Sequence, residues 1–333
     1  MLRYLPLDLH YIGNFVSMIK NIIRSLILLS LSVGMTPIWG LDGNNGTLTY
    51  TYSVFPQLTI TGCLGECPEI LTIPDQIYGE QVVSISDSAF VNQSGLVVVN
   101  LPDSLTTIGS KAFSGSGILS IEIPDSVTSI GYEAFKNTSL TSVKLPSNLT
   151  NIPRGLFQGV TGVTEIVLPD TITDIGSFAF RDMNLSGLVL PSSLRNIGRE
   201  AFYSSAITSL TISDSVELIG YWAFGTSSIE TLVIPESTKF NDSTGNYGVR
   251  SAIPRICSSL VTLVIGQKNV TDFSGCGNLE TVTLLDSVET IANETFEDTN
   301  SLVAIELPDS LTTIGSKAFS GSGILSIEIP DSV

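Results

Sequence analysis

The stretch Ile118-Leu-Ser-Ile-Glu-Ile-Pro-Asp-Ser-Val-Thr-Ser-Ile-Gly-Tyr-Glu-Ala-Phe135 recurs along the chain with a nearly constant period. Its closing motif, Ile-Gly-x-x-Ala-Phe or a close variant, ends at Phe90, Phe113, Phe135, Phe157, Phe180, Phe202, Phe224, Phe296 and Phe319. Successive phenylalanines are 22 or 23 residues apart, except for one gap of 72 residues that we interpret as about three degenerate repeats. A self-similar period of roughly 20 to 50 residues is typical of solenoids, so the sequence predicts stacked coils.

Each repeat combines a short alternating strand with a return segment. In the strand expected at 139–145, Leu140, Val143 and Leu145 point to one side. A single strand cannot bury this side alone, so the next repeat must lie beside it. Proline ends the strand, and we expect the phenylalanines to stack as a spine inside the coils. Tight backbone bends are expected at the glycines before the Ala-Phe pair: Gly109, Gly131, Gly176, Gly198, Gly220 and Gly315.

The run Leu-x-x-Ile-x-Ile-Pro-Asp-Ser-Val-x-x-Ile-Gly-x-x-Ala-Phe resembles the leucine-rich repeat of the BspA-like surface proteins, over roughly residues 70–333. The resemblance implies a β-rich leucine-rich-repeat solenoid, with a parallel sheet on one face and short strands or 3-10 turns on the return side. Upstream, residues 46–90 contain Leu-Thr-Tyr-Thr-Tyr and Leu-Thr-Ile-Thr-Gly, which look like the small β-rich segment that precedes such arrays.

The chain is expected to have three parts. Residues 1–40 are interpreted as an N-terminal extension and signal peptide, with translation starting at Met18 and cleavage near Gly40; an uncleaved anchor is the alternative. The apolar run in this part is shorter than the roughly 20 residues that a membrane span needs, which favours a signal peptide over a span. We also expect no membrane insertion of the mature segment. Residues 41–80 are expected to form a β-rich cap segment, and residues 81–333 a repeat array with an irregular insertion at 238–256.

The C-terminus is expected to be truncated. Residues 307–333 repeat residues 101–127 without a single difference, and the chain stops after Val333 in the middle of a turn. We interpret the identical copy either as a very recent duplication or as a product of mis-assembled repeats.

Composition excludes several classes of function. The 32 acidic and 15 basic residues give a net charge of −17, which disfavours nucleic acid as a partner. His10 is the only histidine and precedes the folded part, so a catalytic triad or a His-ligated metal has no basis. A glycan-active enzyme with two carboxylates remains the catalytic alternative, but no acid pair departs from the repeat pattern. We therefore expect a non-catalytic protein without cofactor or metal.

The outward residue between the last two core positions of each strand forms a row across the predicted sheet. Its members in chain order are Asn100, Glu122, Lys144, Val167, Val189, Thr211, Val233, Val264, Thr283, Glu306 and Glu328. We name its middle part (Val167, Val189, Thr211, Val233 and Val264) the valine stripe. Contiguous exposed apolar patches mark protein contacts, so the stripe is predicted to bind a protein. The alternative is that β-branched residues are simply good strand formers.

The irregular insertion is the second candidate for binding. Phe240, Tyr247, Arg250 and Arg255 supply aromatic and cationic groups of the kind enriched in binding hot spots. The predicted structure is a loop that projects from the stack. A decayed repeat without a partner is the alternative.

The four cysteines are predicted to form two structural disulfides, Cys63–Cys67 in the cap segment and Cys257–Cys276 between adjacent coils.

The turn acids are a third set of candidates, at Asp103, Asp125, Asp170, Asp214, Asp286, Asp309 and Asp331. Calcium bridging is the alternative for them, and turn hydrogen bonding is the preferred interpretation.

These observations favour a secreted or cell-surface protein that acts by binding. The resemblance implies adhesion to a protein ligand, such as an extracellular-matrix or cell-surface protein. The alternative is the ectodomain of a receptor or recognition protein whose membrane and signalling parts lie beyond Val333.

Overall fold

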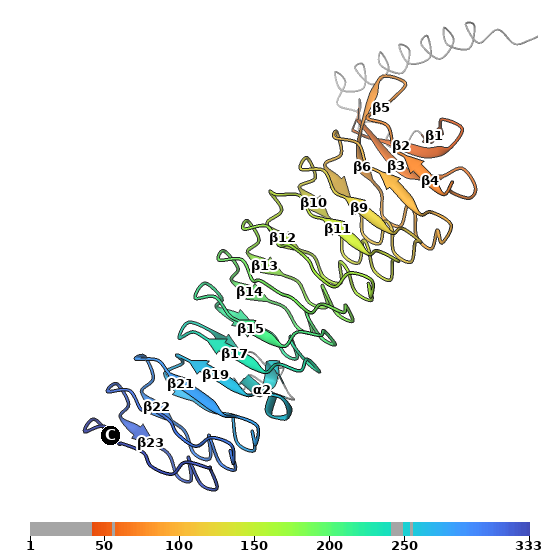
Figure 1. Ribbon diagram of the computed structural model, residues 1–333. Helices are drawn as coiled ribbons and strands as arrows, with labels where there is room; N and C mark the ends of the chain where they lie inside the picture. The colour runs from red at the N-terminus through yellow and green to blue at the C-terminus, as the bar shows by residue number, and fades with distance from the viewer. Residues whose placement is uncertain (1–41, 55–56, 241–248, 254–255) are drawn as a thin grey trace, which may run out of the picture.

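The protein is a stack of coils that forms an elongated rod, as Figure 1 shows. The computed structural model describes residues 42–54, 57–240, 249–253 and 256–333. Most coils have two short parallel strands, one on each of two faces, and a turn-rich third side that carries the Ala-Phe pair or its equivalent. The predicted β-rich solenoid is therefore confirmed. The predicted leader at 1–40 lies outside the described residues.

A cap segment of mainly antiparallel strands begins the structure. Its strands are β1 (Asp42–Asn44), β2 (Leu48–Val54), β3 (Gln57–Cys63), β5 (Gln76–Ile77) and β6 (Glu80–Ile85). The order β1-β2-β3-β6 continues into the strands of the first coils, so the cap sheet merges with one face of the solenoid (Figure 1). Leu58 and Ile60 of β3 are fully buried and cover the first coil.

The first face of the solenoid consists of the strands that end before proline or at an equivalent turn. They are β4 (Ile70–Thr72), β7 (Val98–Asn100), β9 (Ser120–Glu122), β11 (Ser142–Lys144), β15 (Ser209–Thr211), β17 (Thr231–Ile234), β19 (Thr262–Ile265) and β21 (Thr281–Leu284). Between β11 and β15 the face contains a parallel bridge from Glu165 to Gly187. Because β4 pairs in parallel with β7, the parallel stack starts at Ile70, inside the segment 41–80.

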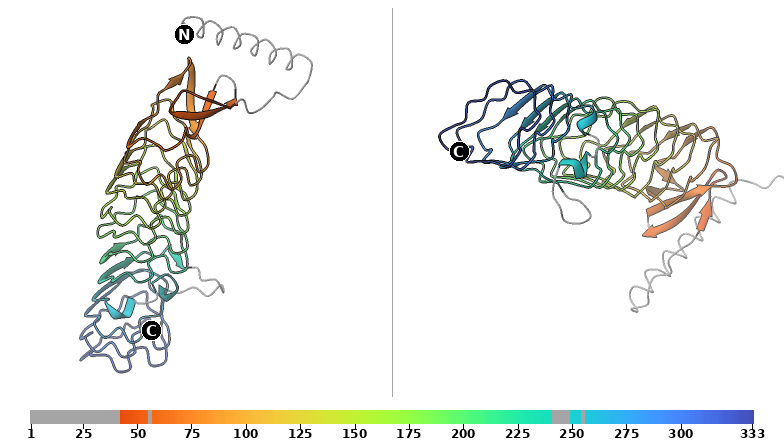
Figure 2. Two further views of the ribbon diagram at one scale, coloured as in Figure 1. Left: turned by 90° about the vertical axis from the view of Figure 1, so that its right-hand side faces the viewer. Right: turned by 90° about the horizontal axis from the view of Figure 1, so that it is seen from below.

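The second face consists of strands two residues long, just before the glycine of the motif or the residue that replaces it. They are β8 (Thr107–Ile108), β10 (Ser129–Ile130), β12 (Asn151–Ile152), β13 (Asp174–Ile175), β14 (Asn196–Ile197), β16 (Leu218–Ile219), β18 (Lys239–Phe240), β20 (Asn269–Val270), β22 (Thr290–Ile291) and β23 (Thr313–Ile314). Pairing is in register, with isoleucine opposite isoleucine, as in Ile108 and Ile130. Strand pairing on this face is interrupted between β10 and β12 and again between β18 and β20. Between β18 and β20 the chain forms helix α2 (Val249–Ala252) and the 3-10 helix η1 (Ile256–Ser258), in the part of the chain drawn in cyan in Figure 2.

Phenylalanines stack through the centre of the coils, which confirms the predicted spine. The rings from Phe90 to Phe224 follow one another with centroids 5.1 to 5.9 Å apart and nearly parallel planes. A second run joins Phe273, Phe296 and Phe319. Phe273 lacks the Ile-Gly-x-x-Ala context and was not predicted. At the break, the backbone N–H of Phe224 donates to the carbonyl of Ala252 in α2.

The glycine of the motif has a different role from the predicted one. None of the six predicted bend glycines has a positive φ. At each of them, an added Cβ would lie only 2.3 to 2.6 Å from a backbone nitrogen of the preceding coil. Glycine is thus required because the coils approach closely. The left-handed bend occurs at the residue before the Ala-Phe pair or its equivalent: Ser88, Lys111, Glu133, Gly155, Phe178, Glu200, Trp222, Glu294 and Lys317.

Alanine at a motif glycine should destabilise the rod, whereas alanine at a glycine outside the coil contact should not. A Cβ at Gly198 would meet the backbone nitrogen of Ser177 at 2.5 Å, so Gly198→Ala should cost about 1–3 kcal/mol, as overpacking does. Gly187 has nothing within 4 Å of its ideal Cβ, so Gly187→Ala should lie within about 0.5 kcal/mol of the parent. Urea denaturation measures both. Equal midpoints for the two variants would contradict the close-approach explanation.

The spine should tolerate truncation poorly. Phe157 is fully buried between Phe135 and Phe180, so Phe157→Ala should lower the free energy of unfolding by about 3–5 kcal/mol. Tyr132 is a matched control because it is 51% exposed and its side chain lies against Lys111 as a cation–π partner. Tyr132→Ala should cost less than about 1 kcal/mol. A similar loss in both variants, measured by thermal and urea denaturation, would show that the stacked rings are not what holds the coils.

Candidate functional site

The valine stripe occupies one row of the first face. In the paired strands, Val233 lies between Thr211 and Val264, and Val264 lies beside Thr283. The bridge between Glu165 and Gly187 sets Val167 and Val189 in the same register two residues further along. The sequence pattern therefore predicted the order of side chains on this face.

Exposure along the stripe is uneven. Val167 and Val189 are 88% and 83% exposed, which is unusual for side chains that could be buried. Thr211 is exposed, whereas Val233 and Val264 are half-buried. The most accessible apolar part of the stripe is thus its N-terminal end, next to the charged pair of β11 and β9.

That charged pair borders the stripe. Lys144 and Glu122 lie side by side on neighbouring strands and form an ion pair. The hydrogen bond and the charge of Glu122 raise the pKa of Lys144 above its ordinary value. Both side chains are largely exposed, so the pair contributes little to stability and instead marks a polar edge.

Phe240 is not the exposed contact residue that the sequence suggested. It belongs to β18, pairs with Ile219 of β16, and is only 2% exposed. Its position in the coil is that of the buried isoleucine in other repeats, so it is a core residue. Tyr247 and Arg255 lie outside the described residues.

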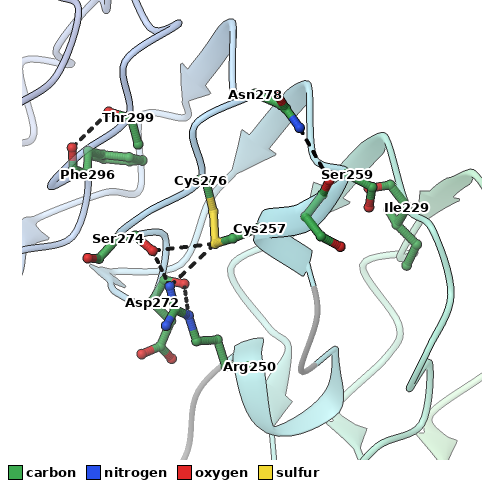
Figure 3. The surroundings of a disulfide bond; sticks show 11 residues. Ile229, Arg250, Cys257, Ser259, Asp272, Ser274, Cys276, Asn278, Phe296 and Thr299 are labelled. Carbon is green, nitrogen blue, oxygen red and sulfur yellow. Dashed lines mark hydrogen bonds between the residues drawn. A yellow bond between two sulfur atoms is a disulfide. The ribbon is translucent and has the colours of Figure 1, made fainter.

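Arg250 fastens the insertion to the next coil (Figure 3). Its Nε donates a hydrogen bond of 2.8 Å to the carbonyl oxygen of Asp272, and its Nη2 donates to the carbonyl oxygen of Ser274. The Cys257–Cys276 disulfide lies beside these bonds and links the same two coils. Although Arg250 is exposed, its guanidinium is engaged, so its role in the structure is to hold the stack together rather than to present a free cation.

The Cys63–Cys67 disulfide is also present, with its Cα atoms 5.3 Å apart in the cap segment. Both bonds thus lie where the chain departs from the regular repeat.

Among the turn acids, Asp125 forms a side-chain hydrogen bond across coils. The carboxylate of Asp125 accepts the backbone N–H of Ser147 in the next coil, with an N···O distance of 2.7 Å. This bond is the main reason that the pKa of Asp125 is lowered. Within the described ranges, no three His, Cys, Asp or Glu side chains are grouped so that they could hold a metal ion. Nor does any helix of these ranges have the length and apolarity to cross a membrane.

Sequence reasoning missed two grooves. The larger, of about 800 Å³, lies at the turns that lead from β17, β19 and β21 towards the second face, and is lined by Lys239, Gln267 and Lys268, among others. The other, of about 590 Å³, runs across β12, β13, β14 and β16, and we name it the axial groove. It carries Arg154, Arg199 and Tyr221 on one side. The clustering of arginine and aromatic residues in the motifs Pro-Arg-Gly-Leu-Phe, Gly-Arg-Glu-Ala-Phe and Gly-Tyr-Trp-Ala-Phe was the available signal.

Comparison with known proteins identifies the repeat. The family described as BspA type Leucine rich repeat region matches in six copies, over residues 69–162, 128–247 and 268–333. The solved structure of a leucine-rich repeat protein from Bacteroides ovatus has a TM-score of 0.55 at 25% identity, covering 88% of this chain and 96% of that one. A leucine rich cell surface protein from Faecalibacterium prausnitzii is 22% identical, with a TM-score of 0.44 and coverage of 86% and 94%. Among the curated proteins, no sequence matches significantly.

Removal of the Arg250 side chain should loosen the link between the insertion and the following coil. Hydrogen bonds that involve a charged group contribute about 1.5–3 kcal/mol, so Arg250→Ala should weaken local protection by at least about 1.5 kcal/mol. Hydrogen exchange of the amides in 256–276 measures this. Arg195 is the control because its guanidinium pairs with Glu217 on the exposed surface, where such pairs contribute about 0.2–1 kcal/mol. Unchanged exchange in Arg250→Ala would mean that the disulfide alone holds this region.

Proposed function

The chain belongs to the BspA-type leucine-rich-repeat family, and on that premise we propose that it acts at the cell surface or after secretion as a non-catalytic solenoid that binds a protein ligand. Leucine-rich-repeat proteins generally serve as protein-interaction modules, and their repeats create extended binding surfaces. The ligand class that the proposal favours is an extracellular-matrix or cell-surface protein, and the function is adhesion.

The observation that carries the proposal is the exposure of Val167 and Val189 in adjacent coils of the first face, where the bridge between Glu165 and Gly187 sets them in register. These side chains have no role in the core, because the buried positions of their coils are filled by Ile166, Leu168 and Leu190. The five residues of the valine stripe lie in successive coils, so at about 4.8 Å per coil the stripe is about 19 Å long. A contiguous apolar strip of this kind on a net acidic protein supports a contact with another protein.

A receptor ectodomain would use the same surface. The two functions differ in the consequence of binding: adhesion attaches the protein to its ligand, whereas a receptor transmits a signal. Adhesion is the simpler function because it needs only the binding surface that the described coils provide.

Charge on the stripe should weaken binding without unfolding the rod. The double variant Val167→Glu with Val189→Glu should lose at least tenfold affinity for immobilised extracellular-matrix proteins, because each glutamate must be desolvated in the contact. Surface plasmon resonance with solubilised matrix protein measures the affinity. Thermal unfolding should be nearly unchanged, since both positions are exposed.

Thr72→Glu provides the matched control. Thr72 is exposed in the same row of the first face, in β4, several coils from the valine stripe. The control should bind as the parent does. If the double variant and the parent bind matrix proteins equally well, the stripe has no role in adhesion. If the parent binds none of them, the adhesion proposal fails.

A further inference from the structure

The axial groove arises from the same glycines that let the coils approach. On the second face, the position after each strand is Pro153, Gly176, Gly198 or Gly220, so no large side chain stands there. Two rows of side chains rise on either side of this bare floor. One row is Asn151, Asp174, Asn196 and Leu218, and the other is Arg154, Ser177, Arg199 and Tyr221. A groove of about 590 Å³ thus runs along the solenoid axis, perpendicular to the strands, within the usual volume of ligand sites.

One side of the groove is cationic on an otherwise acidic chain. The guanidinium of Arg154 has no hydrogen-bond or ion-pair partner in the described part of the protein. Arg199 uses only Nε, which donates a 2.9 Å bond to Glu200, so its two terminal nitrogens are available. The two arginines are two coils apart, which is about 10 Å at the strand spacing of a parallel sheet.

Stacking holds these cations in place. Arg154 lies over the ring of Phe178 at 5.4 Å, and Arg199 lies over Tyr221 at 5.6 Å. Tyr221 in turn stacks on Trp222, and Trp222 stacks on Tyr203. Because these ring faces are occupied by one another and by arginine, they order the groove wall rather than offer free stacking surfaces. A pre-ordered wall lowers the entropy cost of binding.

The coil between the two arginines is acidic where its neighbours are basic. It presents Ser177 on one wall and the carboxylate of Asp174 on the other. Asp174 is oriented by Asn196, whose Nδ2 donates to Oδ1 at 2.7 Å, and by Thr173, whose hydroxyl donates to Oδ2 at 2.6 Å. A ligand that extends along the groove thus meets a cation, then a hydrogen-bond acceptor, then a cation. An anionic group is favoured at alternate coils and disfavoured between them.

We propose that the axial groove binds a linear acidic polysaccharide that carries one carboxylate on every second sugar. In an extended glycan, successive rings are spaced by about the distance between neighbouring coils, so carboxylates on alternate rings face Arg154 and Arg199. The uncharged ring between them offers hydroxyl groups to Asp174 and to the side-chain amides of Asn151 and Asn196 on the same side of the groove. Side chains on one side of an extended peptide recur about every 6.6 Å, which matches neither the coil spacing of about 4.8 Å nor the two-coil spacing of about 10 Å. This site is separate from the valine stripe on the first face.

Isothermal titration calorimetry of the full chain with hyaluronan oligosaccharides tests the proposal, because hyaluronan bears a carboxylate on alternate sugars. Binding is expected, with Arg154→Ala and Arg199→Ala each weakening the affinity at least tenfold. Arg195→Ala is the matched control, since Arg195 is an exposed arginine outside the groove, and it should bind as the parent does. Polygalacturonate, with a carboxylate on every sugar, should bind at least tenfold more weakly, and Asp174→Asn should reduce this difference.

Several results would overturn the proposal. They are absence of hyaluronan binding, hyaluronan binding that survives both groove substitutions, and equal binding of neutral dextran. Arginine-dependent binding of polyglutamate without hyaluronan binding would instead assign the groove to an acidic peptide. The double variant of Val167 and Val189 should keep hyaluronan affinity, so failure of protein adhesion and failure of the groove proposal are distinguishable.

Discussion

The whole rod depends on how closely the backbone of one coil approaches the backbone of the next. At the motif glycine this approach leaves no room for a Cβ. At Gly131, for example, an added Cβ would lie 2.3 Å from the backbone nitrogen of Ser110. Only at this distance do the two-residue strands pair in register and the phenylalanine rings stack at 5 to 6 Å. A larger side chain at one glycine would push two coils apart. It would therefore weaken their strand pairing, their ring stacking and their third-side hydrogen bonds at the same time.

The same constraint separates the core from the functional surfaces. The coils bury the stacked phenylalanines and most of their aliphatic side chains against one another, so a coil has no core without its neighbours. What differs from coil to coil is outward. On the first face the outward row is apolar around Val189, and on the second face the glycine floor leaves a groove between Asn196 and Arg199. Both surfaces run along the axis, which suits elongated or repetitive ligands.

Features that depend on the period were predictable from the sequence. The phenylalanine spine and the order of the valine stripe follow from spacing, because each coil repeats the same path. Features that depend on a neighbouring coil were not predictable. The sequence around Gly198 reads as a bend, and only the position of Ser177 shows that the glycine is there for contact. Phe240 looked like part of a loop because its coil lacks the usual motif, whereas pairing with Ile219 buries it. The axial groove likewise exists only between coils.

The coils are interchangeable units, and none has a hydrophobic core of its own. Deletion of one whole coil tests this most directly. Removal of residues 181–202 joins Phe180 to Tyr203, which occupies the same place in the repeat as Arg181. The shortened chain should fold, with an unchanged circular dichroism spectrum per residue and a cooperative thermal transition. Removal of residues 181–191 alone, half a period, should abolish that transition because it shifts the inward positions outward. Loss of the folded state in both deletions would contradict the account.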